Sequence, residues 1–367
     1  MSVVASIPIR WPGASSAAFP PAPQSTFKTQ PSRIRYRLAM LHTRFTEMFG
    51  ITYPVMAAPM ALHSGGTLAA AVSAAGGLGS FGGTHPWKGP DWIRAEIATV
   101  RATTDRPFGV GFITPLLPLT EPHFEAALEE RPDVVALSFA DPQPWLARAR
   151  AAGARVMCQV QNYDDARAAV AAGADVLVAQ GAEAGGHTGT MGLLPFLAGI
   201  VRRYPDVPVL AAGGIGDGRT LAAVLTAGAD GAWLGTAFLA TPEAIEVHDV
   251  HKRLIVESDG GDTVWTRAYD IVSGLPWPAN IGERVRRNRF TDEWSEREAT
   301  LRDRKEEFAP PKDVSPVEGL PDPDTSEILY GQSAVFVDAV RPAAEVVRTI
   351  ADEAEAILAA RPRSLLR

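Results

Sequence analysis

A histidine among glycines is the feature of this sequence best suited to chemistry. His187 lies in the segment Ala179–Gly189, which ends an apolar, strand-like run and contains four glycines. Glycine lets a backbone approach a ligand closely, and histidine is the side chain that most readily gains and loses a proton near neutral pH. The segment therefore predicts acid–base chemistry just past a buried strand, although it also fits a histidine in a tight turn.

Two further glycine-rich stretches have the composition of an anion-binding site. One is the segment 211–218, Ala-Ala-Gly-Gly-Ile-Gly-Asp-Gly, and the other is the segment 234–236, Leu-Gly-Thr. Backbone N–H groups in such turns, with the N-terminus of a following helix, can point at a phosphate. The alternative is a pair of tight strand-to-helix turns. The residues predicted to hold a phosphate are Gly213, Gly214, Gly235 and Thr236.

Eight short apolar segments alternate with alanine-rich, helix-like segments, and they must position these residues. Most of the eight are continuously apolar, which is typical of parallel strands covered on both faces. Eight strands alternating with helices favour a (β/α)8 TIM barrel, with a doubly wound open sheet as the alternative. In such a barrel His187 and the glycine-rich turns meet at the C-terminal mouth, where barrel enzymes place their sites. The predicted strands are Pro54–Met60, Leu78–Gly82, Phe108–Ile113, Val134–Phe139, Arg155–Val160, Asp175–Gln180, Pro208–Ala212 and Gly231–Phe238.

The helix-like segments end in one recurring pattern. Ala-Ala-Gly or Ala-Gly closes the segments at Ala74–Gly77, Ala151–Ala154, Ala171–Ala174 and Ala227–Asp230, and a predicted strand follows each. Glycine at this position adopts the left-handed conformation that ends a helix. The pattern predicts helices that turn directly back into the sheet.

The regular alternation stops after Phe238, and the rest of the chain divides into two parts. We predict that residues 40–240 form the strands and helices of the barrel and that residues 241–330 are an inserted helical lid over its mouth. The charge-rich part of this insertion, Gly282–Phe308, is expected to be a solvated helical face. Apolar residues recur at helical spacing in Arg341–Ala360, so residues 331–367 are expected to supply the last barrel helix.

The first 39 residues differ from the rest of the chain. They are rich in Ser, Pro and Ala, carry five basic residues and contain no acidic residue. This composition resembles a transit peptide, but the prolines interrupt any long helix. Such a segment buries too little apolar surface to order itself. We predict a disordered extension over residues 1–39, or a natural start at Met40.

Composition narrows the classes of partner and compartment. The 367 residues carry a formal net charge of -7, which argues against a nucleic-acid-binding surface. No apolar stretch reaches the ~18 residues of a membrane span. The lone cysteine, Cys158, excludes an internal disulfide and fits a reducing compartment. We therefore predict a cytoplasmic protein without nucleic-acid or membrane partners, and the sequence leaves a homodimer open.

Several segments, in order along the chain, resemble the nitronate monooxygenase (2-nitropropane dioxygenase) family of FMN-dependent barrel enzymes. Together they span roughly residues 40–360. The similar segments are Pro54–Met60, Ala74–Gly79, Gln180–Gly189, Ala211–Ile215, Leu234–Phe238, Arg287–Trp294 and Gly331–Gln332.

The resemblance implies FMN as the cofactor and an assignment for each candidate residue. The segment Ala58, Pro59 and Met60 would lie against the flavin ring, and Gln180 would hydrogen-bond it. His187 would act as the catalytic base or as an anchor for an anionic substrate. The glycines and the threonine that would hold the ribityl phosphate and its surroundings are Gly185, Gly186, Gly213, Gly214, Gly235 and Thr236.

Two positions depart from the family pattern. Many relatives have Gly-Val-Asn at the end of the third strand, where the Asn binds flavin, whereas this chain has Gly109-Val110-Gly111. Gly111 cannot supply that side chain. Trp233 in the eighth strand also stands where some relatives place a polar flavin contact.

The function implied by the resemblance is the oxidation of an alkyl nitronate, and of neutral nitroalkanes if His187 removes a proton, by dioxygen to a carbonyl compound and nitrite. An NAD(P)H-dependent flavin reductase of the quinone or enoyl-acyl-carrier-protein type is the alternative, because such enzymes share the Gly-Gly-His loop. A non-catalytic flavin-binding protein is a further alternative. We expect no metal site, because the pair His248 and His251 lacks a clear third ligand.

Overall fold

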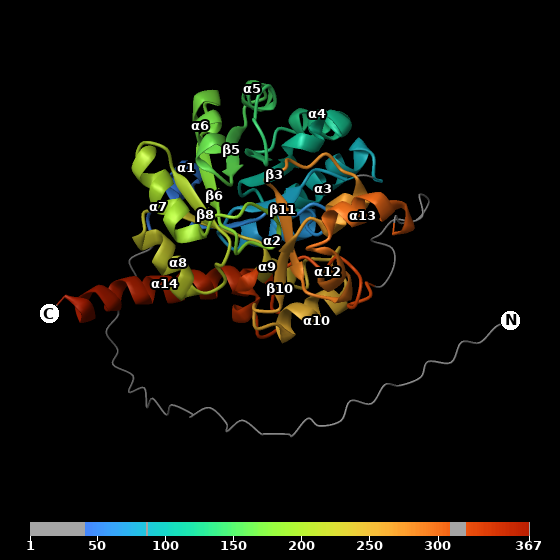
Figure 1. Cartoon of the computed structure of the whole chain (residues 1–367). Coiled ribbons are helices and arrows are strands. Elements are labelled where there is room, and N and C mark those ends of the chain that lie inside the picture. Colours follow the sequence, from blue (N-terminus) through green and yellow to red (C-terminus); the bar gives the residue numbers. More distant parts are fainter. Residues whose placement is uncertain (1–40, 86, 309–320, 367) are drawn as a thin grey trace, which may run out of the picture. The chain divides into compact units, whose positions relative to one another are not determined.

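The computed structural model describes residues 41–85, 87–308 and 321–366, so the extension predicted for residues 1–39 lies outside the described residues. An eight-stranded parallel sheet stands at the centre, in the order β1-β9-β8-β6-β5-β4-β3-β2 (Figure 1). Its strands are β1 Val55–Ala57, β2 Gly79–Gly82, β3 Phe108–Ile113, β4 Val134–Ser138, β5 Arg155–Val160, β6 Val176–Gln180, β8 Val209–Ala212 and β9 Gly231–Leu234.

The sheet closes on itself, which confirms the barrel and excludes the open sheet. The two end strands meet at a parallel bridge between Met56 and Leu78. There the Leu78 N–H donates to the Val55 carbonyl at 2.9 Å, and the Ala57 N–H donates to the Leu78 carbonyl at 3.0 Å. Each of the eight predicted segments contains one strand. The eighth was predicted too long: β9 ends at Leu234, and Thr236–Leu239 forms helix α9, because the chain leaves the sheet at Gly235.

The strands read as continuous apolar runs because both of their faces are covered. Side chains that point into the barrel pack as one buried cluster, which includes Met56, Leu78, Met157 and Leu210. The alternate side chains pack outward against the helices in a second, larger cluster. A parallel sheet with both faces buried has no polar alternation.

The helices around the barrel end as the glycine pattern predicts. Gly76, Gly153, Gly173 and Gly228, one in each predicted helix end, have φ between +93° and +100°. The helices of this part are α1 Arg44–Phe49, α2 Gly66–Ala74, α3 Pro90–Thr103, α4 Glu121–Glu129, α5 Trp145–Ala151, α6 Tyr163–Ala172, α7 Leu193–Arg203 and α8 Gly218–Thr226.

The insertion after β9 contains helices, as predicted, and also strands that the sequence did not predict. Its helices are α10 Asp249–Glu257, α11 Ala268–Ser273, α12 Arg289–Trp294 and α13 Glu298–Arg304, and its strands are β10 Thr263–Thr266 and β11 Gly282–Arg286. The two strands and β7 (Gly186–Thr188) form an antiparallel sheet in the order β10-β11-β7. The insertion is therefore joined by backbone pairing to the segment that carries His187.

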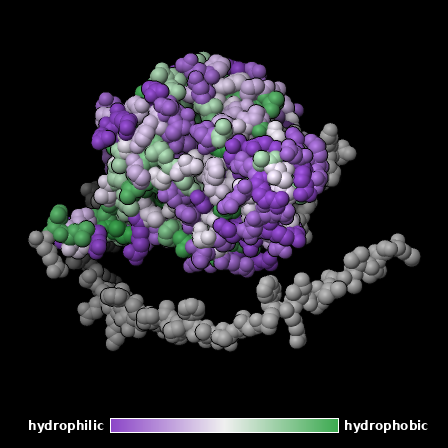
Figure 2. Space-filling view, in the orientation of Figure 1, coloured by the Kyte–Doolittle hydropathy of each residue, from purple (hydrophilic) through white to green (hydrophobic). Residues whose placement is uncertain are grey.

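The charge-rich segment Gly282–Phe308 is only partly a solvated face. Hydrophilic residues cover this side of α12 and α13 (Figure 2), as the sequence predicts. Its first part is instead the strand β11, in which Glu283 is fully buried. The expectation of an exposed helix was wrong for β11 because charge alone does not reveal a buried carboxyl group.

The last helix, α14 (Ala343–Leu365), begins at the third residue of the predicted segment Arg341–Ala360 and contains the rest of that segment. It packs against α8 and α2 on the outside of the barrel (Figure 1). Within the described residues, none of the helices combines the length and apolarity needed to span a bilayer.

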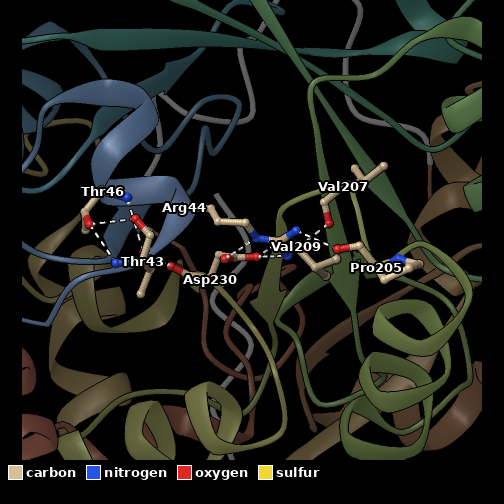
Figure 3. A network of polar contacts seen from close by, with 7 residues as sticks. All are labelled: Thr43, Arg44, Thr46, Pro205, Val207, Val209 and Asp230. Carbon is tan, nitrogen blue, oxygen red and sulfur yellow. Dashed lines mark hydrogen bonds and ion pairs between the residues drawn. The ribbon is translucent and has the colours of Figure 1, made fainter.

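A polar network ties α1 to the N-terminal end of the barrel (Figure 3). The Arg44 guanidinium donates to both carboxylate oxygens of Asp230, at 2.9 and 2.7 Å, and to the Pro205 carbonyl at 2.7 Å. Asp230 is buried and also accepts from the Val209 N–H at 2.9 Å. One carboxylate thus holds together the start of β8, the start of β9 and the first described helix.

We expect Asp230→Ala to lower the free energy of unfolding by about 1–2 kcal/mol. The change leaves the buried Val209 N–H without its acceptor, and leaving such a group unpaired costs about 1–3 kcal/mol. We expect the lower half of this range because the Arg44 side chain is 40 % exposed, so water can replace its lost partner. Urea unfolding measures the loss. The matched control is Asp303→Ala, an exposed position on α13, which should leave the midpoint unchanged; equal losses in both variants would contradict the assignment.

Candidate active site

A cavity of about 1050 Å³, part of it open to solvent, lies at the C-terminal mouth of the barrel. Of the eleven residues predicted for the site, Gly214 alone is not among the residues that line the cavity. The predicted residues that do line it are Ala58, Pro59, Met60, Gln180, Gly185, Gly186, His187, Gly213, Gly235 and Thr236.

His187 lies in strand β7, and an acidic side chain of the insertion holds it. Its Nε2 lies 2.8 Å from Oδ1 of Asp270, and the two side chains are only 16 % and 9 % exposed. A carboxylate can only accept, so this contact assigns the proton to Nε2. Nδ1 is then the nitrogen with a free lone pair, which is the arrangement of a general base held by a carboxylate.

An aromatic side chain covers the imidazole. The Trp277 ring stacks on His187 with 3.5 Å between ring centroids and 11° between the planes. Phe139 contacts both rings by its edge. Stacking fixes the plane of the imidazole. The insertion therefore supplies both the carboxylate and the cover of the candidate base.

Gln180 holds the backbone of His187 in place. Its Nε2 donates to the His187 carbonyl at 3.0 Å, and its Oε1 accepts from Gln161 Nε2 at 2.8 Å. Both amide atoms are thus engaged within the protein, and one amide proton is left for a ligand. The role predicted for Gln180, a hydrogen bond to flavin, stays a prediction.

The glycine-rich turns at Gly213 and Gly235 line the cavity. Gly213 has φ +98°, a conformation that favours glycine. The Thr236 hydroxyl accepts from the Gly331 N–H at 2.9 Å, which leaves its own proton to donate. The turn that carries Gly331 is held to the histidine segment, because the Gln332 N–H donates to the Glu183 carbonyl at 3.0 Å.

The absence of a side chain at Gly111 has a steric reason. A Cβ at Gly111 would lie 2.2 Å from Cγ of Pro59, far inside van der Waals contact. Pro59 thus fills the space that a side chain at position 111 would need. Trp233 is buried and lines the cavity.

We expect Gly111→Ala to destabilise the fold by about 1–3 kcal/mol, the usual cost of overpacking, and to weaken cofactor uptake, because Pro59 must move. Thermal unfolding and cofactor titration measure the two effects. Gly89→Ala is the matched control, since a Cβ at Gly89 meets nothing within 4 Å. A Gly111→Ala protein as stable as the control would contradict the steric assignment.

Sequence reasoning missed several residues of the site. Asp270 lies 83 residues from His187 in the chain, and no local pattern distinguishes it or Trp277 from other residues of the insertion. Ser138 and Gln159, at adjacent strand ends, also line the cavity. The sequence held one signal for these residues. The alternation of strands and helices predicts a barrel, and in a barrel every C-terminal strand end is a candidate position for a site residue.

A half-buried histidine, His63, and a buried histidine, His251, contact each other at the wall of the cavity. His63 lines the cavity, and burial lowers its pKa. Its ring contacts His251, whose pKa burial lowers to about 3, and His251 Nε2 lies 2.9 Å from the Leu329 carbonyl. Among the described residues, no group of three or more His, Cys, Asp or Glu side chains is placed to hold a metal ion.

The sequence and the fold match known proteins over most of the chain. The family model for nitronate monooxygenase matches residues 42–353. A Mycobacterium tuberculosis protein, (3aS,4S,5R,7aS)-5-hydroxy-7a-methyl-1-oxo-octahydro-1H-indene-4-carboxyl-CoA dehydrogenase, is 36 % identical over 238 residues, which is 64 % of this chain and 65 % of that protein. The matched part therefore spans less than two thirds of that relative's length.

Two solved structures are similar over nearly their whole length. FabK from Thermotoga maritima aligns with a TM-score of 0.77 and 31 % identity, covering 89 % of this chain and 99 % of the other. Nitroalkane oxidase from Streptomyces ansochromogenes aligns with a TM-score of 0.67 and 32 % identity, covering 88 % and 99 %. With the family model matching residues 42–353, this chain belongs to the nitronate monooxygenase family of oxidoreductases.

Proposed function

We propose that the protein oxidises alkyl nitronates, and neutral nitroalkanes after deprotonation, with FMN as cofactor and dioxygen as electron acceptor; the products are a carbonyl compound and nitrite. The observation that carries the proposal is the contact between His187 and Asp270 at the wall of the cavity. It supports a role for His187 as a base toward a small acidic substrate in the cavity. The family membership and the similarity to a nitroalkane oxidase support this choice.

The residues around the cavity fit FMN. Ala58, Pro59 and Met60 offer an apolar wall for a planar ring, and Ser138 and Gln159 offer neutral polar groups. On the other side, the Gly213 and Gly235 turns and the Thr236 hydroxyl offer donors for a phosphate. When bound, FMN would accept electrons from the nitronate and pass them to dioxygen.

The chain's own residues would handle the proton. His187 Nδ1 would take the proton from the carbon next to the nitro group, while Asp270 stabilises the positive charge that the imidazole gains. Trp277 would keep water from the imidazole. With a nitronate that is already deprotonated, the protonated His187 would hold the negative oxygens instead.

The test is an absorbance spectrum of the purified protein after incubation with FMN, followed by oxygen uptake with propionate-3-nitronate and ethylnitronate. We expect a yellow protein with non-covalent FMN, oxygen consumption and nitrite release. A colourless protein that takes up no FMN would exclude the proposal.

A second candidate function rests on the Mycobacterium relative, whose name states that it acts on a carboxyl-CoA compound. In that case the cavity would serve the oxidation or reduction of an acyl thioester, with NAD(P)H as a candidate partner. Anaerobic mixing of the flavin-loaded protein with NADH or NADPH separates the candidates. Rapid bleaching of the flavin would favour a reductase, whereas bleaching only by nitronate would favour the first proposal.

A further inference from the structure

A fully buried carboxyl group lies beside the candidate base and has no role in the site described so far. Glu283 stands in β11 directly opposite His187 in β7. Side chains of residues that face each other in an antiparallel pair lie on the same face of the sheet, with Cβ atoms about 4.5–5.5 Å apart. The Glu283 side chain therefore lies next to the imidazole on the protein side.

The carboxyl oxygens around this point are unsatisfied. Both oxygens of Glu283 and Oδ2 of Asp270 are buried without a hydrogen-bond partner among the described residues. A buried ionised carboxyl group without partners is costly, and proteins avoid it by neutralising the group. A proton on Glu283 would remove its charge and supply a donor for a neighbouring carboxylate.

The charges around Glu283 favour its protonated form. Burial raises the pKa of Glu283 well above its ordinary value, and the carboxyl groups of Glu327 and Asp270 raise it further. The backbone of Tyr269 acts in the opposite direction and lowers the pKa of Glu283, though less than burial and the two carboxyl groups raise it. His187 lies across the strand pair. Glu327 is exposed to solvent, so the acidic groups lead from the cavity wall to the surface.

We infer that Glu283 is the buried acid of a proton path that runs from His187 through Asp270 and Glu283 to Glu327. This inference rests on the proposed function. His187 takes the substrate proton on Nδ1 and passes its Nε2 proton to Asp270. Glu283 accepts that proton as it gives its own to Glu327, and solvent removes it there. Before the next turnover, proton exchange with solvent in the open cavity returns the imidazole to its resting tautomer, with the proton on Nε2. One proton enters at the substrate, one leaves at the surface, and no electron moves.

Glu283→Gln tests the path, because glutamine keeps the shape and stays neutral but cannot relay a proton. We expect turnover of a neutral nitroalkane to fall about 10-fold, less than the ~10²–10⁴-fold that a general base contributes, while pre-formed nitronate is turned over as before. Glu257→Gln, an exposed position on α10, is the matched control and should change neither rate. Unchanged turnover of both substrates by Glu283→Gln would overturn the path.

Two measurements on the full chain detect the proton on Glu283 in the absence of substrate. Infrared difference spectra between wild type and Glu283→Gln should contain the carbonyl band of a protonated carboxyl group at neutral pH. A carboxyl group with a raised pKa stabilises the fold at low pH and loses that contribution as pH rises through its folded-state pKa. Glu283→Gln should therefore lose less stability than wild type as pH rises above the ordinary carboxyl range. Without the band, or with parallel stability curves, the inference fails. A wild-type protein without nitronate turnover would refute the proposed function instead. The infrared band and the stability curves would then still show whether Glu283 is protonated.

Discussion

Replacing His187 with asparagine should abolish most turnover of neutral nitroalkanes and leave flavin binding intact. His187 is the only ionisable side chain between Glu183 and Arg202, so no neighbour in its own segment can replace it as a base. Loss of a positioned base costs ~10²–10⁴-fold in rate. The groups that would hold FMN, the Gly213 and Gly235 turns and Thr236, are untouched by the change.

Steady-state rates on a neutral nitroalkane and on its pre-formed nitronate decide which role His187 has. A nitronate needs no deprotonation, so it should lose less than the neutral form if His187 is mainly a base. Equal losses would favour anchoring of the anion. Unchanged rates on both substrates would remove His187 from the mechanism, and a His187→Asn protein without flavin would contradict the separation of binding from catalysis.

The barrel could be predicted from the sequence because its signals are local. Most predicted strands are runs of apolar residues, and the four helix ends marked by the Ala-Gly pattern carry a glycine that the structure places in the left-handed conformation. Closure of the sheet then follows from eight such units. Two strands were predicted too long: β1 ends at Ala57 rather than at Met60, and β9 ends at Leu234 rather than at Phe238. After β9 the apolar run continues into helix α9, and apolar composition does not distinguish a strand from a helix.

The polar half of the site could be predicted only in part, because its contacts join distant segments. The His187 segment was recognisable from its glycines, but its partner Asp270 and its cover Trp277 come from the insertion. Glu283 belongs to a charge-rich stretch, and its burial depends on the pairing of β11 with β7. No periodicity in the insertion indicates that pairing. The position of Pro59 against Gly111 likewise depends on how two strand ends meet.

Asp270→Asn should lower turnover of neutral nitroalkanes by about 10²-fold and leave flavin binding unchanged. The amide either turns its oxygen toward His187 Nε2 and loses the negative charge, or turns its NH2 group and imposes the other tautomer. Both outcomes weaken the base: in the Ser-His-Asp triad of a serine protease the same change costs about 10⁴ in kcat. Hydrogen bonds to a charged partner are the stronger kind, so the ionised carboxylate has no neutral substitute.

A double variant separates this positioning role from general damage to the insertion. If Asp270 acts only through His187, the variant that carries both His187→Asn and Asp270→Asn should be no slower than His187→Asn alone, because residues that act as a unit are not additive. Asp292→Asn is the matched control: this acid lies in α12 of the same insertion and pairs with Arg287 at the surface. Losses that multiply in the double variant, or that appear equally in the control, would mean that Asp270 supports the fold of the insertion rather than the base.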